Sequence, residues 1–452
     1  MKRREEKIPH LGQLKKWIRL NREFAIIDLF SDLHPADIAD LIDNLAEQEK
    51  IHLFSLLEVE KASDVITELS DVSREQILED ISDKKLAEII DEMDSDDAAD
   101  VIAELPEDQA RAILAEIEPD ESQDLKNLLK YEEDTAGGIM QSELVSVPSD
   151  STINDALKAV IQASEEIENV YNVFVVDKDN TLIGTIPLQR LITAKRTSPA
   201  TESVDKDIPS VQTDVDQEEV ARMFEKYDLV SLPVVDTGNH LLGRITIDDI
   251  VDVMEEESSE DIYRIAGLDE DDTVFNEPME SVKRRLPWLY LNLVTALASA
   301  LVIGFFEDTI RMVIALAVFM PVVAAIGGNA GSQTLTLIVR GLALGEVTFD
   351  NAKKALYKQI VVGVVNGMAV GIVIGIIAFL WKGMPVLGVV LGLAMIINVF
   401  VGTLIGTLVP LSLKWIKADP ALGSHIFVTA FTDAFGFLSF LGLATIFLKL
   451  LV

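Results

Sequence analysis

The stretch "FVTAFTDAFGFLSFLGLATIFL", residues 427–448, is apolar over a length that can cross a lipid bilayer, except at Asp433. A charged side chain deep inside a membrane-spanning helix costs about 2.5–3.5 kcal/mol on insertion scales, so such a residue is a candidate functional residue. The interior of the run holds no Arg, Lys or His that would neutralise the carboxylate. We therefore expect its partner to be a mobile cation, with the protonated carboxyl of a proton-coupled carrier as the alternative.

Four other apolar runs of similar length occur in the last third of the chain, which favours a bundle of membrane-spanning helices over the buried core of a soluble domain. In the second run, "GGNAGSQ" (327–333) is expected to interrupt the helix with backbone that is buried or lines a wet cavity. In the fourth run, Asn398, Gly402 and Gly406 form a stripe that is typical of close helix packing. The five expected spans are roughly 288–306, 312–339, 358–381, 386–413 and 424–448.

The Lys and Arg residues beside these runs predict the orientation of the chain. Nine of them lie before the first run, between the second and third, or between the fourth and fifth, whereas three lie on the opposite side. This bias places the large N-terminal region and both longer loops on the cytoplasmic side of the plasma (inner) membrane. Residues 1–17 lack the apolar core of a signal peptide, so we expect a cytoplasmic N-terminus. Five spans then leave the C-terminus outside.

The charge of the chain is divided unevenly. Residues 283–452 hold 6 acidic and 12 basic side chains, whereas residues 1–282 carry a net charge of −43. Such a charge opposes a compact state unless cations screen or bridge it, and it argues against nucleic acid as a partner, because phosphate binding needs clustered Lys and Arg. The chain has no cysteine for thiolate-bound zinc or copper, and its five histidines lack metal-ligand spacing. Oxygen ligands favour a hard divalent cation such as Mg²⁺, Ca²⁺ or Mn²⁺.

The acidic region begins with two kinds of repeat. Residues 1–130 repeat short amphipathic helices, such as "LHPADIADLIDNL" (33–45), which predicts a small all-helical superhelix. Residues 131–255 contain two copies, 131–200 and 201–255, of a strand–helix–strand–strand–helix pattern. The expected fold is therefore a multi-domain membrane protein with an all-α domain, an α/β pair and a transmembrane helical domain at 283–452.

The two α/β copies are aligned by "VVDKDNTLIG" (175–184) and "VVDTGNHLLG" (234–243). They resemble tandem CBS domains, a regulatory module that often binds adenine nucleotides, so ATP is an expected second ligand. The Thr-x-x-Asp associated with the nucleotide is present in the second copy as Thr246 and Asp249. At the matching positions, the first copy has Pro187 and Arg190.

A connecting helix, assigned to residues 256–282, joins these domains to the membrane part, and "IVDVMEEESSEDIYRIA" (250–266) predicts its helical start. Like charges at helical spacing destabilise an isolated helix by a few tenths of a kcal/mol per pair. Either water solvates these acids, as in an ordinary linker, or a divalent cation supplies the missing counter-charge. The four that crowd one side are Glu256, Glu257, Glu260 and Asp261.

Three motifs point to a family: "YEEDTAGGIM" (131–140), "PVVAAIGGNAGSQTLTLIVR" (321–340) and "TDAFGF" (432–437). With these motifs and this order of parts, nearly the whole chain resembles the MgtE family of magnesium channels. The resemblance implies a homodimer in the lipid bilayer that imports Mg²⁺ through a pore at the dimer axis, lined by the second and fifth spans. The pore residues that it implies are Asp433, Gly328, Asn329, Ser332 and, through its carbonyl, Thr429.

The resemblance also implies that cytosolic Mg²⁺ closes the pore by binding acidic residues between the helical domain, the CBS domains and the connecting helix. One of them, Asp249, belongs to both the magnesium and the nucleotide hypotheses. The implied sensor residues are Asp64, Asp96 and Asp100 in the helical domain, Glu218, Asp228 and Asp249 in the second CBS copy, Glu257, Glu260 and Asp261 on the connecting helix, and Asp419 before the fifth span.

Two other functions stay open on the residues alone. In an alternating-access carrier, Asp433 would cycle between a divalent cation and a proton. In a membrane-anchored cation or nucleotide receptor, nothing would be transported. An enzyme is not expected, because the sequence offers no nucleophile–base pair, P-loop or histidine cluster.

Overall fold

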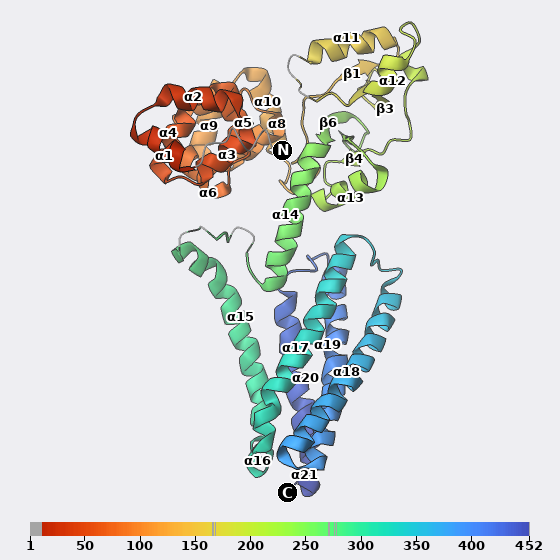
Figure 1. Ribbon diagram of the computed structural model, residues 1–452. Helices are drawn as coiled ribbons and strands as arrows, with labels where there is room; N and C mark the ends of the chain where they lie inside the picture. Colours follow the sequence, from red (N-terminus) through yellow and green to blue (C-terminus); the bar gives the residue numbers. More distant parts are fainter. Residues whose placement is uncertain are drawn as a thin grey trace. The chain divides into compact units, whose positions relative to one another are not determined.

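The structure is a computed structural model that describes residues 11–164, 167, 169–269, 272–274, 276 and 278–451. The segment 1–10, on which the expectation of a cytoplasmic N-terminus partly rests, lies outside them. The chain divides into two compact units, Met1–Met254 and Glu255–Val452. Figure 1 shows the helices and strands of both.

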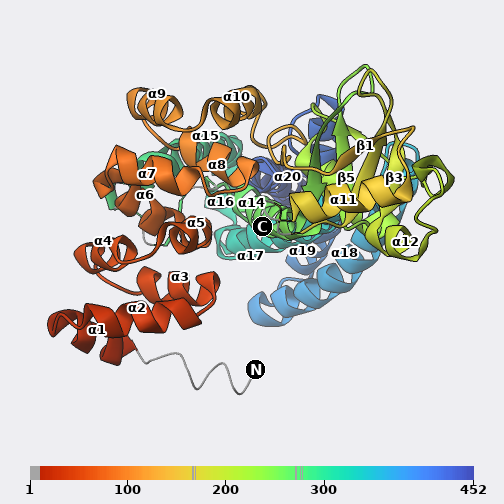
Figure 2. The same cartoon turned by 90° about the horizontal axis from the view of Figure 1, so that it is seen from above.

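From Leu11 on, where the described residues start, the first unit forms ten short helices, which confirms the predicted all-helical domain. Residues at the starts of the helices favour helix formation there: the Ser82 hydroxyl accepts a hydrogen bond from Lys85 N, and Pro35 occupies the first turn after His34. Successive odd-numbered helices pack on one another, α3 on α5, α5 on α7 and α7 on α9, so the helices follow one another in a curved row (Figure 2). The ten are α1 (Leu11–Arg19), α2 (Glu23–Asp32), α3 (Pro35–Asp43), α4 (Glu47–Ser55), α5 (Val59–Thr67), α6 (Asp71–Asp80), α7 (Asp83–Ile90), α8 (Ser95–Ala103), α9 (Glu107–Glu116) and α10 (Pro119–Leu128).

Two copies of one α/β pattern follow, as the paired motifs predict. In each copy the first strand is parallel to the second, and the third is antiparallel to the second. The turns of the two motifs contact each other reciprocally: Asn180 Nδ2 donates to Leu241 O (2.8 Å) and Asn239 Nδ2 donates to Leu182 O (3.0 Å). The first copy contains β1 (Ser146–Pro148), α11 (Ile153–Ala163), β2 (Asn172–Val176), β3 (Leu182–Pro187) and α12 (Leu188–Thr193), and the second contains β4 (Val211–Gln212), α13 (Gln217–Tyr227), β5 (Ser231–Val235), β6 (Leu241–Thr246) and α14 (Ile247–Ala266), with a short 3₁₀ turn, Ala200–Glu202, between them.

The connecting helix differs from its predicted extent of 256–282. Helix α14 starts directly after β6 and ends at Ala266, where Gly267 adopts a left-handed φ of 71°. Glycine at this position is the usual helix stop, because it has no Cβ to clash in that conformation. The next helix begins only at Pro278.

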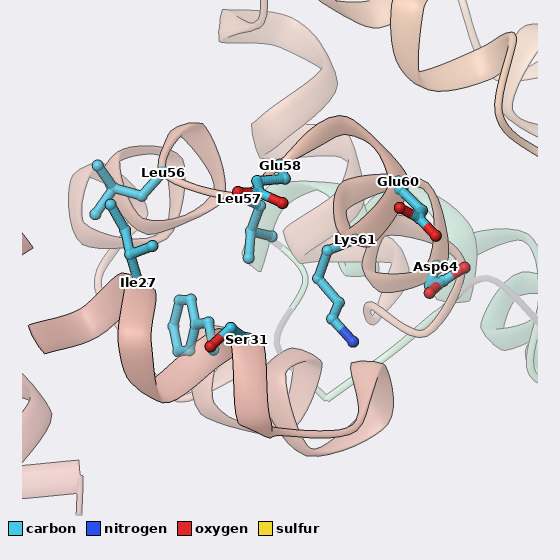
Figure 3. A pocket seen from close by; sticks show the side chains of 9 residues that line it. Ile27, Ser31, Leu56, Leu57, Glu58, Glu60, Lys61 and Asp64 are labelled. Carbon is cyan, nitrogen blue, oxygen red and sulfur yellow. The ribbon is translucent and has the colours of Figure 1, made fainter. Parts of the chain in front are cut away.

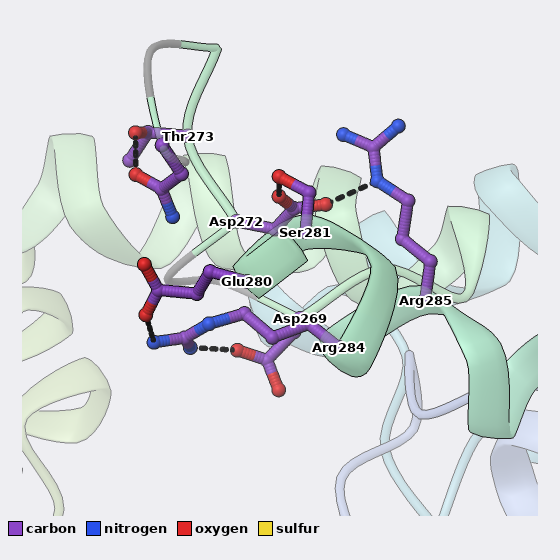
Figure 4. Close-up of polar contacts among 8 residues, drawn as sticks. Asp269, Asp272, Thr273, Glu280, Ser281, Arg284 and Arg285 are labelled. Carbon is purple, nitrogen blue, oxygen red and sulfur yellow. Dashed lines mark hydrogen bonds and ion pairs between the residues drawn. The ribbon is translucent and has the colours of Figure 1, made fainter. Parts of the chain in front are cut away.

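Ion pairs hold the intervening segment against the start of the next helix (Figure 4). Arg284 pairs with Asp269 (2.7 Å) and with Glu280 (3.3 Å). The Asp272 carboxylate accepts hydrogen bonds from Ser281 Oγ (2.6 Å) and from Arg285 Nε, and its side chain is fully covered. Residues 256–266 of the predicted 256–282 helix are thus helical and 278–282 belong to α15, to which these contacts tie Asp269 and Asp272.

Among the described residues, the second unit contains five helices that are long and apolar enough to cross a membrane, which confirms the five predicted spans. Helix α19 packs against α17, α18 and α20, and α17 also packs against α20 (Figure 1). Two short helices, α16 (Glu307–Met312) and α21 (Leu448–Leu451), accompany them. The five are α15 (Pro278–Gly304), α17 (Ala315–Ala343), α18 (Ala352–Lys382), α19 (Pro385–Trp415) and α20 (Ser424–Ile446).

The expected interruption at "GGNAGSQ" is wrong, because α17 is helical through all of it. Its glycines serve packing and not unwinding. A Cβ at Gly402 of α19 would lie 2.7 Å from Gly327 O, and one at Gly406 would lie 2.5 Å from Gly331 O. The backbones of α17 and α19 therefore approach more closely than any larger residue allows, as the stripe Asn398, Gly402 and Gly406 predicts.

Candidate functional site

A polar stripe runs along one face of α20. His425, Thr429 and Asp433 are four residues apart, so they lie one above another on the same side of the helix. The neighbouring α17 presents Gly328 and Ser332 at the same spacing. A Cβ at Gly328 would lie 4.0 Å from the Thr432 hydroxyl, so this part of α17 faces α20.

Asp433 lies half-buried on this stripe. Within the part of the chain that the structure describes, no hydrogen bond or ion pair reaches its carboxylate. A carboxylate in an apolar helix bundle needs a counter-charge or a proton. The arrangement therefore leaves this group available to a cation that the chain itself does not supply.

Ser332 and Thr429 come together through a residue that the sequence analysis missed. The Ser332 hydroxyl donates to Gly328 O (2.9 Å) and lies 2.9 Å from His425 Nδ1. The Thr429 hydroxyl lies 3.5 Å from His425 Nε2. The spacing of 425, 429 and 433 was the available signal for His425. Asn329, the fifth predicted pore residue, is exposed and points about 100° away from Gly328 around α17.

In the first unit, acidic residues of α8 face the start of α14. Asp96 is 6% exposed, and its Oδ1 has no hydrogen-bond partner. Burial, and then the charge of Asp249, raise the pKa of Asp96 well above its ordinary value, and the same two causes raise the pKa of Asp97 to about 7. The predicted residues Asp96 and Asp249 therefore do lie near each other, and Asp97 is an addition to them.

Asp249 is held at the β6–α14 junction. Its Oδ2 accepts hydrogen bonds from Thr246 Oγ1 (2.8 Å) and Thr246 N (3.2 Å), so the Thr-x-x-Asp motif caps α14. Burial nevertheless raises the pKa of Asp249 to about 6, against the lowering effect of these bonds. In the first copy, Arg190 instead contacts Ser203 O (3.1 Å) and Asp205 (3.5 Å).

The other predicted sensor residues of the first unit lie in three places. Asp64 lines a cavity of about 230 Å³ between α2 and α5 with Phe30, Leu57 and Lys61 (Figure 3). Glu68 lies four residues after Asp64. Its pKa is raised by burial and, to a smaller extent, by the charge of Asp252. Three further predicted residues are placed as follows: Asp100 on α8, Glu218 on α13 with Arg222 at 3.9 Å, and Asp228 at the C-terminus of α13 with a φ of 51°.

In the second unit, the end of α14 meets the loop before α20. Arg264 pairs with Asp419 (2.9 Å) and with Glu260, and Gly423 N donates to Arg264 O (3.2 Å). Burial, and then the charge of Asp419, raise the pKa of Asp261 to about 6. The structure thus brings together Glu260, Asp261 and Asp419 as predicted, around an arginine that was not. Glu257 lies one turn earlier on α14.

These carboxylates fit weak, hydrated magnesium and not a closed metal cage. Among the described residues, no group of three or more Asp, Glu, His or Cys side chains is arranged to hold one metal ion. Mg²⁺ sheds water reluctantly and is usually held by one or two carboxylates with several waters retained. Asp96 has a buried oxygen that lacks a partner, and Asp261 faces Asp419, which also pairs with Arg264, so each place offers one or two carboxylates.

Comparisons with known proteins cover most of the chain. The family profile described as "Divalent cation transporter" (MgtE) matches residues 320–443, the MgtE intracellular N domain matches 33–134, and the CBS domain matches 136–196 and 202–256. A protein named magnesium transporter MgtE from Thermus thermophilus is 33% identical over 430 residues, 94% of this chain and 95% of its own length. One with the same name from Enterococcus faecalis is 31% identical over 73% of this chain and 72% of its own length.

Two solved structures resemble part of this chain. The cytosolic domain of the Mg²⁺ channel MgtE in complex with ATP is 32% identical, has a TM-score of 0.51, and covers 54% of this chain and 99% of its own. The soluble part of a magnesium transporter is 29% identical with a TM-score of 0.51, and covers 56% of this chain and 99% of its own.

Proposed function

Because this chain belongs to the MgtE family of magnesium transporters, we propose that it is a magnesium channel that imports Mg²⁺ across the plasma membrane and is closed by cytosolic Mg²⁺. The observation that carries the proposal is the half-buried Asp433 carboxylate, to which no described residue supplies a counter-charge. It lies on α20 beside α17, on a face that also carries hydroxyl groups. A hydrated Mg²⁺ donates hydrogen bonds from its waters, and these oxygens accept them.

A homodimer would place two copies of this stripe around one pore. Each copy would contribute Asp433 together with Gly328, Ser332 and Thr429 from the facing helices. Two carboxylates match the charge of one Mg²⁺ and the small number of carboxylates that usually hold this ion. In this arrangement the N-terminal unit lies in the cytoplasm and the C-terminus outside, in agreement with the Lys and Arg bias.

The acidic clusters are the proposed sensor. Asp96, Asp97 and Asp249 repel one another in the first unit, as Asp261 and Asp419 do in the second. Mg²⁺ would bridge the carboxylates and favour the packed, closed state, and loss of Mg²⁺ would let them separate. Burial first, and then this repulsion, raise the pKa values of these groups.

The energetics favour many weak sites over one strong site. A site with a millimolar Kd binds with only about −4 kcal/mol, and moving a gate from 1:99 to 99:1 needs about 5.5 kcal/mol of differential binding. If each ion prefers the closed state about tenfold, worth about 1.4 kcal/mol, roughly four ions must act together. Two clusters per chain, doubled in a dimer, supply that number.

The pore assignment is tested by Mg²⁺ uptake into liposomes that carry the full chain. Asp433→Asn removes the charge but keeps the shape, and it is expected to abolish the flux. Asp308→Asn on α16 is the matched control and is expected to keep it. Uptake by Asp433→Asn at the wild-type rate would remove Asp433 from the mechanism.

The sensor assignment is tested in the same liposomes with Mg²⁺ varied on the side of the acidic unit. The double variant Glu257→Ala with Asp261→Ala is expected to need severalfold more Mg²⁺ to close. If its inhibition by Mg²⁺ equals that of the wild type, the end of α14 is not a sensor.

Two finer points belong to the same proposal. A carrier in which Asp433 exchanges Mg²⁺ for a proton predicts that flux stops when the proton gradient is removed, whereas a channel conducts without one. ATP is proposed at the second CBS copy, since the solved cytosolic domain with ATP is similar to this chain and Thr246 and Asp249 are present. Equal ATP binding by the wild type and by Thr246→Ala would exclude that position.

A further inference from the structure

His425, on the α20 stripe, contacts one residue of the facing helix α17 and one residue of its own helix. Its Nδ1 lies 2.9 Å from Ser332 Oγ of α17, and its Nε2 lies 3.5 Å from Thr429 Oγ1 of α20. The side chain is exposed. It stands one turn before Thr429 and two turns before Asp433, so it precedes both along the proposed path.

One arrangement of the hydrogen bonds places the ring proton on Nδ1. A serine hydroxyl has one proton, which Ser332 can donate to Gly328 O at 2.9 Å. In that arrangement the contact between Ser332 Oγ and Nδ1 is made by an N–H of His425, with the serine oxygen as acceptor. In the neutral ring this leaves the lone pair on Nε2, the atom that faces Thr429.

This is the arrangement that prepares an imidazole for a metal ion. Histidines that bind metals usually donate the other ring N–H to a nearby acceptor, which fixes the tautomer and the ring orientation. Ser332 is that acceptor here. Imidazole nitrogen suits Ni²⁺, Co²⁺ and Zn²⁺ much better than Mg²⁺, which prefers oxygen.

We propose that His425 Nε2 binds a late first-row divalent metal ion, such as Ni²⁺, at the end of the ion path where α20 begins, and that the bound ion blocks Mg²⁺ flux. Thr429 Oγ1 is the nearest protein oxygen, and water completes the coordination. The blocking effect rests on the proposed function, whereas binding itself does not. Mg²⁺ passes with its waters because it gains little from the nitrogen.

Two variants separate the ligand from its support. In His425→Asn, the amide can take the place of Nδ1 and keep a donor to Ser332, but the Nε2 ligand is gone. Ser332→Ala keeps the imidazole and removes the acceptor that orients it. The matched control is His240→Asn, in the second CBS copy, where the ring is paired with Asp236 at 2.8 Å.

Two measurements are made on each purified full-length variant: Ni²⁺ binding in excess Mg²⁺, and the Ni²⁺ concentration that halves Mg²⁺ uptake. We expect His425→Asn to lose a Ni²⁺ site and to resist the block by more than about tenfold, and Ser332→Ala to bind Ni²⁺ about tenfold more weakly. The control is expected to match the wild type in its block by Ni²⁺.

Equal Ni²⁺ binding by the wild type and His425→Asn overturns the inference, and so does an equal block. If His425→Asn takes up no Mg²⁺, the binding measurement alone decides: a retained site contradicts the proposal and a lost site supports it. If the wild type takes up no Mg²⁺, the proposed function fails, and Ni²⁺ binding still tests His425 separately.

Discussion

Asn398 shows how a single buried amide sets the spacing of the helices behind the polar stripe. It is fully buried on α19, and its Nδ2 donates to Val323 O of α17 (2.8 Å). Its side chain fills the space above two glycines: a Cβ at Gly436 would lie 2.6 Å from Nδ2, and one at Gly327 would contact the same atom. Gly327 of α17 and Gly436 of α20 thus leave room for the amide of Asn398 on α19.

We therefore expect Gly327→Ala to destabilise the membrane unit by about 1–3 kcal/mol, because the added methyl group collides with the amide of Asn398. The double variant Gly327→Ala with Asn398→Ala should recover part of the loss, since the second change removes the obstacle. Thermal unfolding in detergent measures both. Gly442→Ala is the matched control, because nothing lies within 4 Å of its added Cβ. Equal loss in the single and double variants would contradict this packing.

For single residues, the sequence shows that an unusual residue such as Asp433 is present more readily than it shows which residues contact one another. Asp433 was found because a charge in an apolar run is visible locally. His425 was missed because its role depends on which turn of α17 faces α20, and only the packed helices determine that. Arg264 was missed for the same reason, since it is an ordinary basic residue until Asp419 lies beside it.

Helix α14 carries carboxylates at both of its ends. Its start faces α8, and its end meets the loop before α20. Arg264 is the resident positive charge at the second place, between Glu260 and Asp419. It therefore competes with any cation that binds there.

Replacing this arginine has a defined effect. In Arg264→Gln, Glu260 and Asp419 lose their counter-charge, so Mg²⁺ should bind more tightly by about two- to fivefold, as expected for a partly exposed ion pair. The measurement is the Mg²⁺ concentration that halves uptake, which should fall. Arg311→Gln, which breaks a pair with Glu307 on α16, is the control. A halving concentration that stays constant or rises in Arg264→Gln would speak against Mg²⁺ at this end of α14.

The other end of α14 predicts a pH dependence. The pKa of Asp97 is raised to about 7 and that of Asp249 to about 6, from an ordinary value of 3.8. Between the ordinary and the raised pKa values, the folded state binds more protons than the unfolded state. The stability around α8 therefore falls as the pH rises from about 4 to about 7. Mg²⁺ should restore it above pH 7 and have little effect near pH 4.5.

Hydrogen exchange of the α8 amides in the full chain, with and without Mg²⁺, measures this effect at each pH. In Asp97→Asn, both the pH dependence and the gain from Mg²⁺ should shrink, because one of the repelling charges is gone. Protection by Mg²⁺ that is equally large at low and neutral pH would show that the carboxylates of this cluster are not its site.

Elements with a strong local pattern were predictable, and those fixed by neighbours were not. The two α/β copies and five spans follow from alternation, repeated motifs and apolar length. The continuity of α17 could not be predicted in this way, because glycines in a short stretch of sequence indicate a broken helix. In the packed bundle the backbone bonds of α17 persist, and the glycines instead admit α19. Gly267 was an available signal for the end of α14 at Ala266, whereas the ion pair of Asp269 with Arg284 depends on the fold.

Charge is distributed along the whole chain as the proposed function requires. The net charge of −43 on residues 1–282 makes the acidic region responsive to cations, and the apolar remainder carries only 6 acidic residues. This division, the order of the domains and the family were all visible in the sequence. Which acids face one another was not, because pairs such as Asp96 and Asp249 are far apart along the chain and meet only in the fold.

The most direct test of the account is Mg²⁺ flux through the full-length protein in liposomes, measured while Mg²⁺ is varied on the side of the acidic unit. We expect fast flux at low Mg²⁺, closure as Mg²⁺ rises through the millimolar range, and no flux in Asp433→Asn under either condition. Flux that persists in Asp433→Asn, or wild-type flux that ignores Mg²⁺ on the acidic side, would contradict it.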